Sequence, residues 1–153
     1  MGGQLAQQYG VQDPTFVLQK HFVTTVSTEL GLKDIESVLT AETGETARNV
    51  SLIQKTYHTG LMFVFETWMI HYMYHMFSPT KYWLTYWGKG SLYQLEDSQK
   101  LWSAMCEVKG DSENSATLDQ LRANNGALLK KQLGVSAHAC ADQLVDDFLG
   151  KDE

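Results

Sequence analysis

The stretch from Glu66 to Phe77, ETWMIHYMYHMF, places three chemically capable groups in the most apolar part of the chain. His71 and His75 are four residues apart, so on a helix they share one face. Two imidazoles there could bind one zinc ion, or one of them could ligate a haem iron. These histidines are the candidate cofactor-binding residues. Because no third ligand lies near them in the sequence, we expect no metal or other cofactor.

Glu66 does not belong to the same ligand set. At about 100° per residue on a helix, His71 lies about 140° and His75 about 180° around the axis from Glu66. A carboxylate among methionine and aromatic side chains needs a cation or a hydrogen-bond donor from another part of the protein. We therefore expect Glu66 to be an interaction residue that a neighbouring segment or subunit contacts.

The chain contains none of the sequence motifs that usually mark an enzyme active site. It has no G-x-S-x-G turn, no glycine-rich phosphate loop, no EF-hand loop and no E-x-x-H pair, so we expect no catalytic residues. The net charge is -6 and basic residues do not cluster beyond Lys130 and Lys131, which excludes nucleic acid as a partner. Cys106 and Cys140 lack C-x-x-C spacing, and we expect isolated, buried thiols.

The elements that position these residues are all predicted to be helices. The expected fold class is therefore all-α, with about five to six helices in one domain of 153 residues. Asp13 caps and Gly31 ends a first helix over 14–30. A long central helix covers 45–77, because no proline interrupts that span. Amphipathic helices follow over 91–109, 117–133 and 136–149.

Two local signals lie within the predicted helix over 117–133. Thr117 and Gln120 have the spacing of a capping box, in which each side chain bonds to the backbone of the other residue. The run Asn124-Asn125-Gly126 favours a turn, so we expect a kink in the helix there.

Residues 59–77 also have the composition of a transmembrane helix, which needs about 20 apolar residues. They contain no lysine, arginine or aspartate, and Trp83, Tyr86 and Trp87 follow where a headgroup-level aromatic belt would lie. On a helix these three aromatic side chains share one face. We expect them, together with Glu66, to contact a lipid bilayer or a neighbouring subunit.

These features favour a non-catalytic accessory subunit, with structural and assembly roles, of a large membrane protein complex. The first ten residues have neither an apolar signal core nor an arginine, so we expect no cleaved presequence. By elimination, the best assignment is the mitochondrial inner membrane, in a respiratory complex or an ATP synthase, with other protein subunits and lipid as partners. A soluble helical-bundle binding protein is the alternative. A haem- or metal-binding helical protein that uses His71 or His75 is the second alternative.

Overall fold

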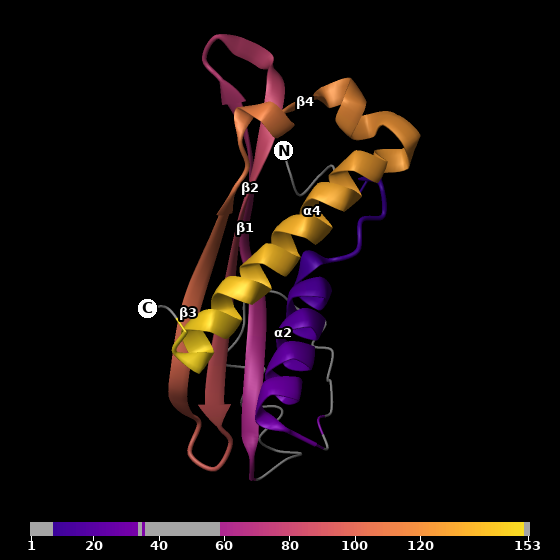
Figure 1. The fold of residues 1–153 in the computed structure, drawn as a ribbon. Helices are drawn as coiled ribbons and strands as arrows, with labels where there is room; N and C mark the ends of the chain where they lie inside the picture. Colours follow the sequence, from indigo (N-terminus) through magenta and orange to yellow (C-terminus); the bar gives the residue numbers. More distant parts are fainter. Residues whose placement is uncertain (1–7, 34, 36–58, 152–153) are drawn as a thin grey trace.

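The structure is a computed structural model that describes residues 8–33, 35 and 59–151 of the chain. Three long strands form an antiparallel sheet, and two helices pack across one face of it (Figure 1). The elements are, in chain order, α2 (Pro14–Leu30), β1 (Leu61–His75), β2 (Ser78–Gln94), β3 (Gln99–Lys109), the 3-10 helix η1 (Ser112–Asn114), β4 (Ala116–Thr117) and α4 (Leu118–Leu149).

The fold is mixed α/β, so the prediction of an all-α fold is wrong. Residues 61–75 of the predicted central helix form β1, and residues 45–58 lie outside the described part of the chain. The predicted helix over 91–109 is also wrong, because it contains the end of β2, a turn at 95–98 and β3. Within the described residues, no helix is both long and apolar enough to cross a membrane, which removes the predicted span over 59–77.

β1 and β2 pair along nearly their whole length, up to the point where His75 lies opposite Ser78. Met76 and Phe77 alone connect the two strands. β3 pairs with the other edge of β2, and β4 pairs with β2 near Lys81, beyond the end of β3. β1 and β3 are therefore the two edge strands, and the connected end of the β1–β2 hairpin extends beyond the helices (Figure 1).

Trp68 is an extra residue in β1. Thr67 lies opposite Gly88 and Met69 lies opposite Trp87, so Trp68 has no counterpart on β2. Such a β-bulge reverses the alternation of side chains along the strand. The side chains that face the helices are Phe63, Phe65 and Thr67 before the bulge and Ile70 and Tyr72 after it.

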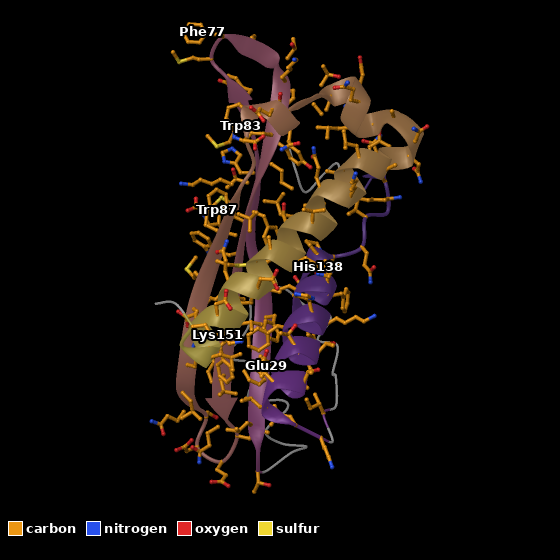
Figure 2. The ribbon with its side chains drawn as sticks, viewed as in Figure 1. Glu29, Phe77, Trp83, Trp87, His138 and Lys151 are labelled. Atoms are coloured by element: carbon orange, nitrogen blue, oxygen red, sulfur yellow. A yellow bond between two sulfur atoms is a disulfide. The ribbon has the colours of Figure 1, made fainter. Side chains whose placement is uncertain are left out.

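α2 has the caps that the sequence predicts. The Asp13 carboxylate accepts a hydrogen bond from the Thr15 N–H at 2.9 Å, and Gly31 ends the helix in the left-handed conformation, with φ of 63°. An exposed ion pair joins the C-terminal ends of α2 and α4, because Lys151 Nζ lies 3.4 Å from Glu29 Oε1 (Figure 2).

α4 contains both of the predicted C-terminal helices, over 117–133 and 136–149, but the predicted break between them is absent. The capping box of Thr117 and Gln120 is present, with both bonds formed. The predicted kink is also present, since residues 123–126 leave the helical conformation before the helix resumes and continues to Leu149.

Aromatic rings join the two layers. Phe22 of α2 is fully buried and contacts the rings of Phe63, Phe65, Trp102 and Phe148, with centroid distances from 4.9 to 5.8 Å. These rings come from α2, β1, β3 and α4. One side chain therefore contacts both helices and both edge strands, and burial of such a ring stabilises the fold by about 3 kcal/mol or more.

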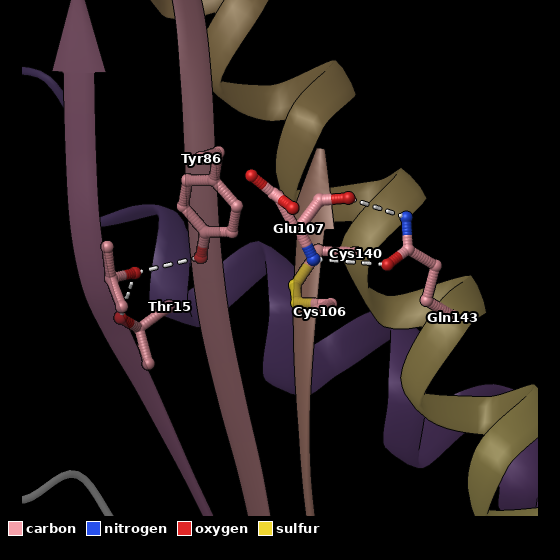
Figure 3. The surroundings of a disulfide bond; sticks show 7 residues. Thr15, Tyr86, Cys106, Glu107, Cys140 and Gln143 are labelled. Atoms are coloured by element: carbon pink, nitrogen blue, oxygen red, sulfur yellow. Dashed lines mark hydrogen bonds between the residues drawn. A yellow bond between two sulfur atoms is a disulfide. The ribbon is translucent and has the colours of Figure 1, made fainter. Parts of the chain in front are cut away.

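A disulfide also joins the layers. Cys106 of β3 and Cys140 of α4 are bonded, with their Cα atoms 5.2 Å apart and a sequence separation of 34 (Figure 3). Both residues are buried, as expected, but the expectation of isolated thiols is wrong. Sequence spacing did not reveal the bond, because the pairing depends on α4 packing across β3.

Two glycines of β2 leave room for this packing. A Cβ atom at Gly88 would lie 2.6 Å from Cys140 Sγ and 3.0 Å from Cys106 Sγ. A Cβ atom at Gly90 would lie 2.9 Å from the Trp102 ring. These glycines are therefore required for space.

We expect Gly88→Ala to destabilise the protein by about 1 to 3 kcal/mol, because either the disulfide or the strand must move. Urea unfolding under non-reducing conditions measures this loss. Gly134→Ala is the matched control, since nothing lies within 4 Å of the added methyl group and the helix should gain about 0.5 to 1 kcal/mol. A Gly88→Ala protein as stable as wild type would contradict the packing described.

Removing the disulfide with Cys106→Ala and Cys140→Ala should cost about 3 to 4 kcal/mol, from the entropy of a closed loop of this length. In that background Gly88→Ala should cost less than in wild type, because the clashing sulfur atoms are gone. The four proteins form a double-mutant cycle by urea unfolding. Equal Gly88→Ala penalties in both backgrounds would show that the disulfide does not set the requirement for glycine.

Candidate functional site

The face of the sheet that points away from α2 and α4, here called the open face, carries large apolar side chains. Strand alternation assigns the apolar members Met62, Val64, Met69 and Met73 of β1, Trp83 and Trp87 of β2, and Leu101 and Met105 of β3. Met69, Met73, Leu101 and Met105 are between 39% and 55% exposed. Exposed apolar residues that form a continuous patch mark binding surfaces, and methionine and tryptophan are typical of them.

Charged residues cross the middle of the open face. Glu66 of β1 lies directly opposite Lys89 of β2, which in turn lies opposite Met105 of β3. Opposite charges in this position stabilise an antiparallel pair by roughly 0.2 to 1 kcal/mol. Lys89 is therefore a cation on the neighbouring strand, placed opposite Glu66 by the strand register.

The other predicted interaction residues are divided between the two faces of the sheet. Trp83 and Trp87 are half-buried on the open face and lie along β2 on the side away from α2 (Figure 2). Tyr86 is fully buried on the covered face, so it is not available to a partner. The prediction of one continuous aromatic face is wrong, because residues that share a face of a helix alternate along a strand.

The two candidate cofactor-binding histidines also lose their predicted geometry. His71 and His75 belong to β1, where residues four apart are separated by about 13 Å and not by one helical turn. Their spacing therefore no longer brings two imidazoles to one ion. Within the described residues, no group of three or more His, Cys, Asp or Glu side chains could hold a metal ion.

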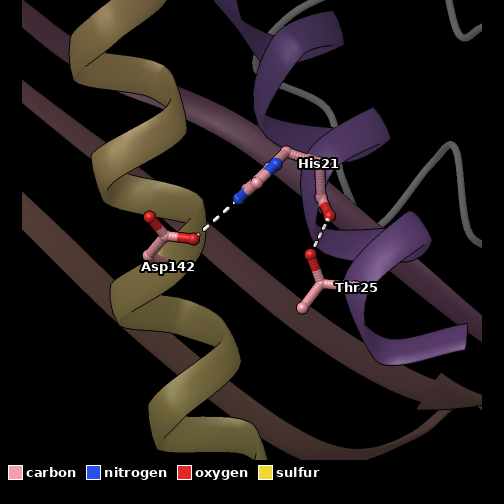
Figure 4. A network of polar contacts seen from close by, with 3 residues as sticks. All are labelled: His21, Thr25 and Asp142. Atoms are coloured by element: carbon pink, nitrogen blue, oxygen red, sulfur yellow. Dashed lines mark hydrogen bonds and ion pairs between the residues drawn. The ribbon is translucent and has the colours of Figure 1, made fainter. Parts of the chain in front are cut away.

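His21 and Asp142 are in contact, a pairing that no sequence signal had predicted. His21 Nε2 lies 2.6 Å from Asp142 Oδ1, joining α2 to α4, and the Thr25 hydroxyl donates to the His21 carbonyl oxygen (Figure 4). The His138 ring packs against the His21 ring, with centroids 4.5 Å apart. The spacing of His138 and Asp142 on one helix was visible in the sequence, but the packing of α2 on α4 was not.

This histidine–aspartate pair is a surface contact. Asp142 is 64% exposed, and exposed pairs contribute roughly 0.2 to 1 kcal/mol. Within the described residues, no hydroxyl or thiol side chain is hydrogen-bonded to the His21 ring. The pair therefore lacks the nucleophile that a hydrolytic triad requires.

A chain of hydroxyl groups lies on the covered face beside the disulfide. Thr15 Oγ1 lies 2.8 Å from Thr67 Oγ1, which lies 2.8 Å from the Tyr86 hydroxyl (Figure 3). Burial raises the pKa of Tyr86 to about 12, although its hydrogen bond with Thr67 acts in the opposite direction. Burial also raises the pKa of Tyr72 above its ordinary value. Both phenols stay neutral at physiological pH and serve packing.

A shallow cleft of about 310 Å³ lies between the residues before α2 and the middle of α4. Val11, Pro14 and Leu133 supply apolar lining, and Lys130 is the one charged residue among the described side chains that line it. A small apolar hollow with a single cation does not define a substrate or a reaction. The open face therefore remains the strongest candidate site.

The described residues define a two-layer α/β protein with one covered and one open sheet face. No family model, curated protein or solved structure matches this chain.

We expect the stability of the protein to fall as the pH rises from 10 to 12. Tyr86 has a pKa of about 12 in the folded state and about 10 in the unfolded state, so the folded state holds the proton more tightly. That contribution is complete below pH 10 and is lost as the phenol ionises. Urea unfolding across this range should show a shallower decline for Tyr86→Phe, which removes one titrating group. Identical slopes for the two proteins would contradict the assignment.

Proposed function

We propose that this chain is a non-catalytic binding subunit that docks another protein on its open face. The observation that supports this most is that, among the residues that the structure describes, helices cover only one face of the sheet. A sheet with one face in water normally shows polar residues on that face. Here the corresponding positions carry Met69, Met73, Leu101 and Met105.

The composition of the open face favours a protein partner over a small molecule. Methionine side chains adapt to a partner surface, and tryptophan contributes a large contact area at little entropic cost. Lys89 and Glu66 lie between the apolar residues, where they can fix the orientation of a partner through charge. A broad surface of this kind fits another folded domain or a long segment.

Two parts of the sequence-based hypothesis stay predictions. These are membership of a membrane-bound complex and a location at the mitochondrial inner membrane, and both were argued from a helical span that the strand β1 replaces. Disulfides form in oxidising compartments, so we expect the chain to fold where Cys106 and Cys140 can be oxidised.

Replacing open-face methionines with lysine should release the partner. We expect Met69→Lys and Met105→Lys each to reduce the amount of co-purifying partner about tenfold, which corresponds to about 1.4 kcal/mol. Both side chains are exposed in the isolated chain, so the fold should tolerate the change. The measurement is quantitative mass spectrometry of the tagged full-length chain purified from its own cells.

Val135→Lys is the matched control, because Val135 is an exposed apolar residue of α4, outside the open face. It should retain the partner. Equal loss of the partner in all three variants, or retention in all three, would contradict the open face as the binding surface.

A further inference from the structure

The two edges of the sheet differ in how they are protected. On β3, Gln143 of α4 accepts a hydrogen bond from the Glu107 N–H at 3.2 Å and donates one to the Glu107 carbonyl oxygen at 3.0 Å (Figure 3). The Gln143 side chain therefore satisfies the N–H and the carbonyl oxygen of Glu107 at this edge. Lys100 and Lys109 also place positive charges on β3. Covered backbone and lysines are two of the devices that prevent edge strands from pairing.

Within the described residues, β1 has neither of these two devices, although it carries a bulge. Glu66 is the only charged residue unless a histidine is protonated, and the strand contains no lysine, arginine or proline. Within the described residues, no strand pairs with its outer edge. A long, apolar edge of this kind is a template for another strand.

We propose that β1 pairs antiparallel with β1 of a second copy of this chain, about a two-fold axis between Trp68 and Met69. The result is a symmetric dimer with one continuous sheet, in which every contact occurs twice. This inference does not depend on the proposed function, since it concerns the edge of the sheet and not its open face.

The bulge at Trp68 restricts the register. Residues directly opposite each other in an antiparallel pair share a face, so each covered-face residue must meet a covered-face residue of the second copy. With the axis between Trp68 and Met69, Thr67 lies opposite Ile70 and Phe65 lies opposite Tyr72. All four belong to the covered face. A shift by one residue would place covered-face side chains opposite open-face ones.

The same register brings exposed apolar residues together. Tyr74, which is 62% exposed, lies opposite the partly buried Phe63. Trp68 and Met69, at 58% and 39%, lie opposite each other across the axis. The pairing thus covers side chains that are expensive to leave in water, at about 25 cal/mol per Å².

The charges of the open face are complementary in this register. Glu66 of one copy lies opposite His71 of the other, and both side chains belong to the open face. An imidazole donates a hydrogen bond to a carboxylate or, when protonated, forms an ion pair with it. Glu66 then lies between Lys89 of its own chain and His71 of the second copy.

Cysteine cross-linking tests the register directly. Val64→Cys and Met73→Cys in the same chain should place one new thiol opposite the other across the two copies, with Cβ atoms about 4.5 to 5.5 Å apart. Mild oxidation should then give a covalent dimer on a non-reducing gel. Each single variant is a control, because its thiol would meet a valine or a methionine. Single variants that cross-link as well as the pair would overturn the register.

Exchanging the charges at positions 66 and 71 tests the proposed pairing of Glu66 with His71 of the second copy, without introducing thiols. Glu66→Lys should weaken the dimer about tenfold, or about 1.4 kcal/mol. Adding His71→Glu should restore it, because opposite charges meet again. Both proteins carry the same unfavourable contact with Lys89, so any difference between them comes from the second copy. Failure of the double variant to recover would contradict the pairing of Glu66 with His71.

The wild-type chain provides the test that needs no substitution. Light scattering after gel filtration should give twice the mass of one chain, with dissociation on dilution. Hydrogen exchange should show that the outward amides of β1 are protected only in the dimer. A monomer at all concentrations, or a dimer with unprotected β1 amides, would overturn the proposal.

Discussion

In the described part of the chain, α2 and α4 cover only one face of the sheet, and the rest of the described structure depends on this constraint. α2 and α4 are fixed there by the aromatic rings around Phe22 and by the bond between Cys106 and Cys140. The side chains of the two core clusters pack on that side, while the side chains of the open face point away from the helices. The difference between the two faces, and therefore the candidate site, follows from this arrangement.

The covered face is closely fitted because β2 has no side chain at two positions. Gly88 gives room to the disulfide and Gly90 gives room to Trp102, so α4 can lie close to the middle of the sheet. Between them, Lys89 points to the open face, opposite Glu66. Three consecutive residues of β2 thus serve both faces of the sheet. Gly88 and Gly90 make room for the core on the covered face, and Lys89 lies opposite Glu66 on the open face.

The sequence was sufficient for elements whose signals are local. Asp13, Gly31 and the capping box of Thr117 mark helix ends through bonds within a few residues, and all three are present. β1 was misassigned because both faces of the strand are apolar and the bulge at Trp68 breaks the period of two. Its many aromatic and β-branched residues were the available signal for a strand. The disulfide and the open face depend on long-range packing, which one sequence does not encode visibly.

Oxidative footprinting of the methionines tests the central claim most directly, because it compares the same native chain with and without its partners. Met73 and Met105 are both exposed on the open face of the isolated chain. They should oxidise readily in the purified protein and be protected in the complex isolated gently from cells. Equal oxidation of these methionines in both samples would contradict the account of the open face as the binding surface.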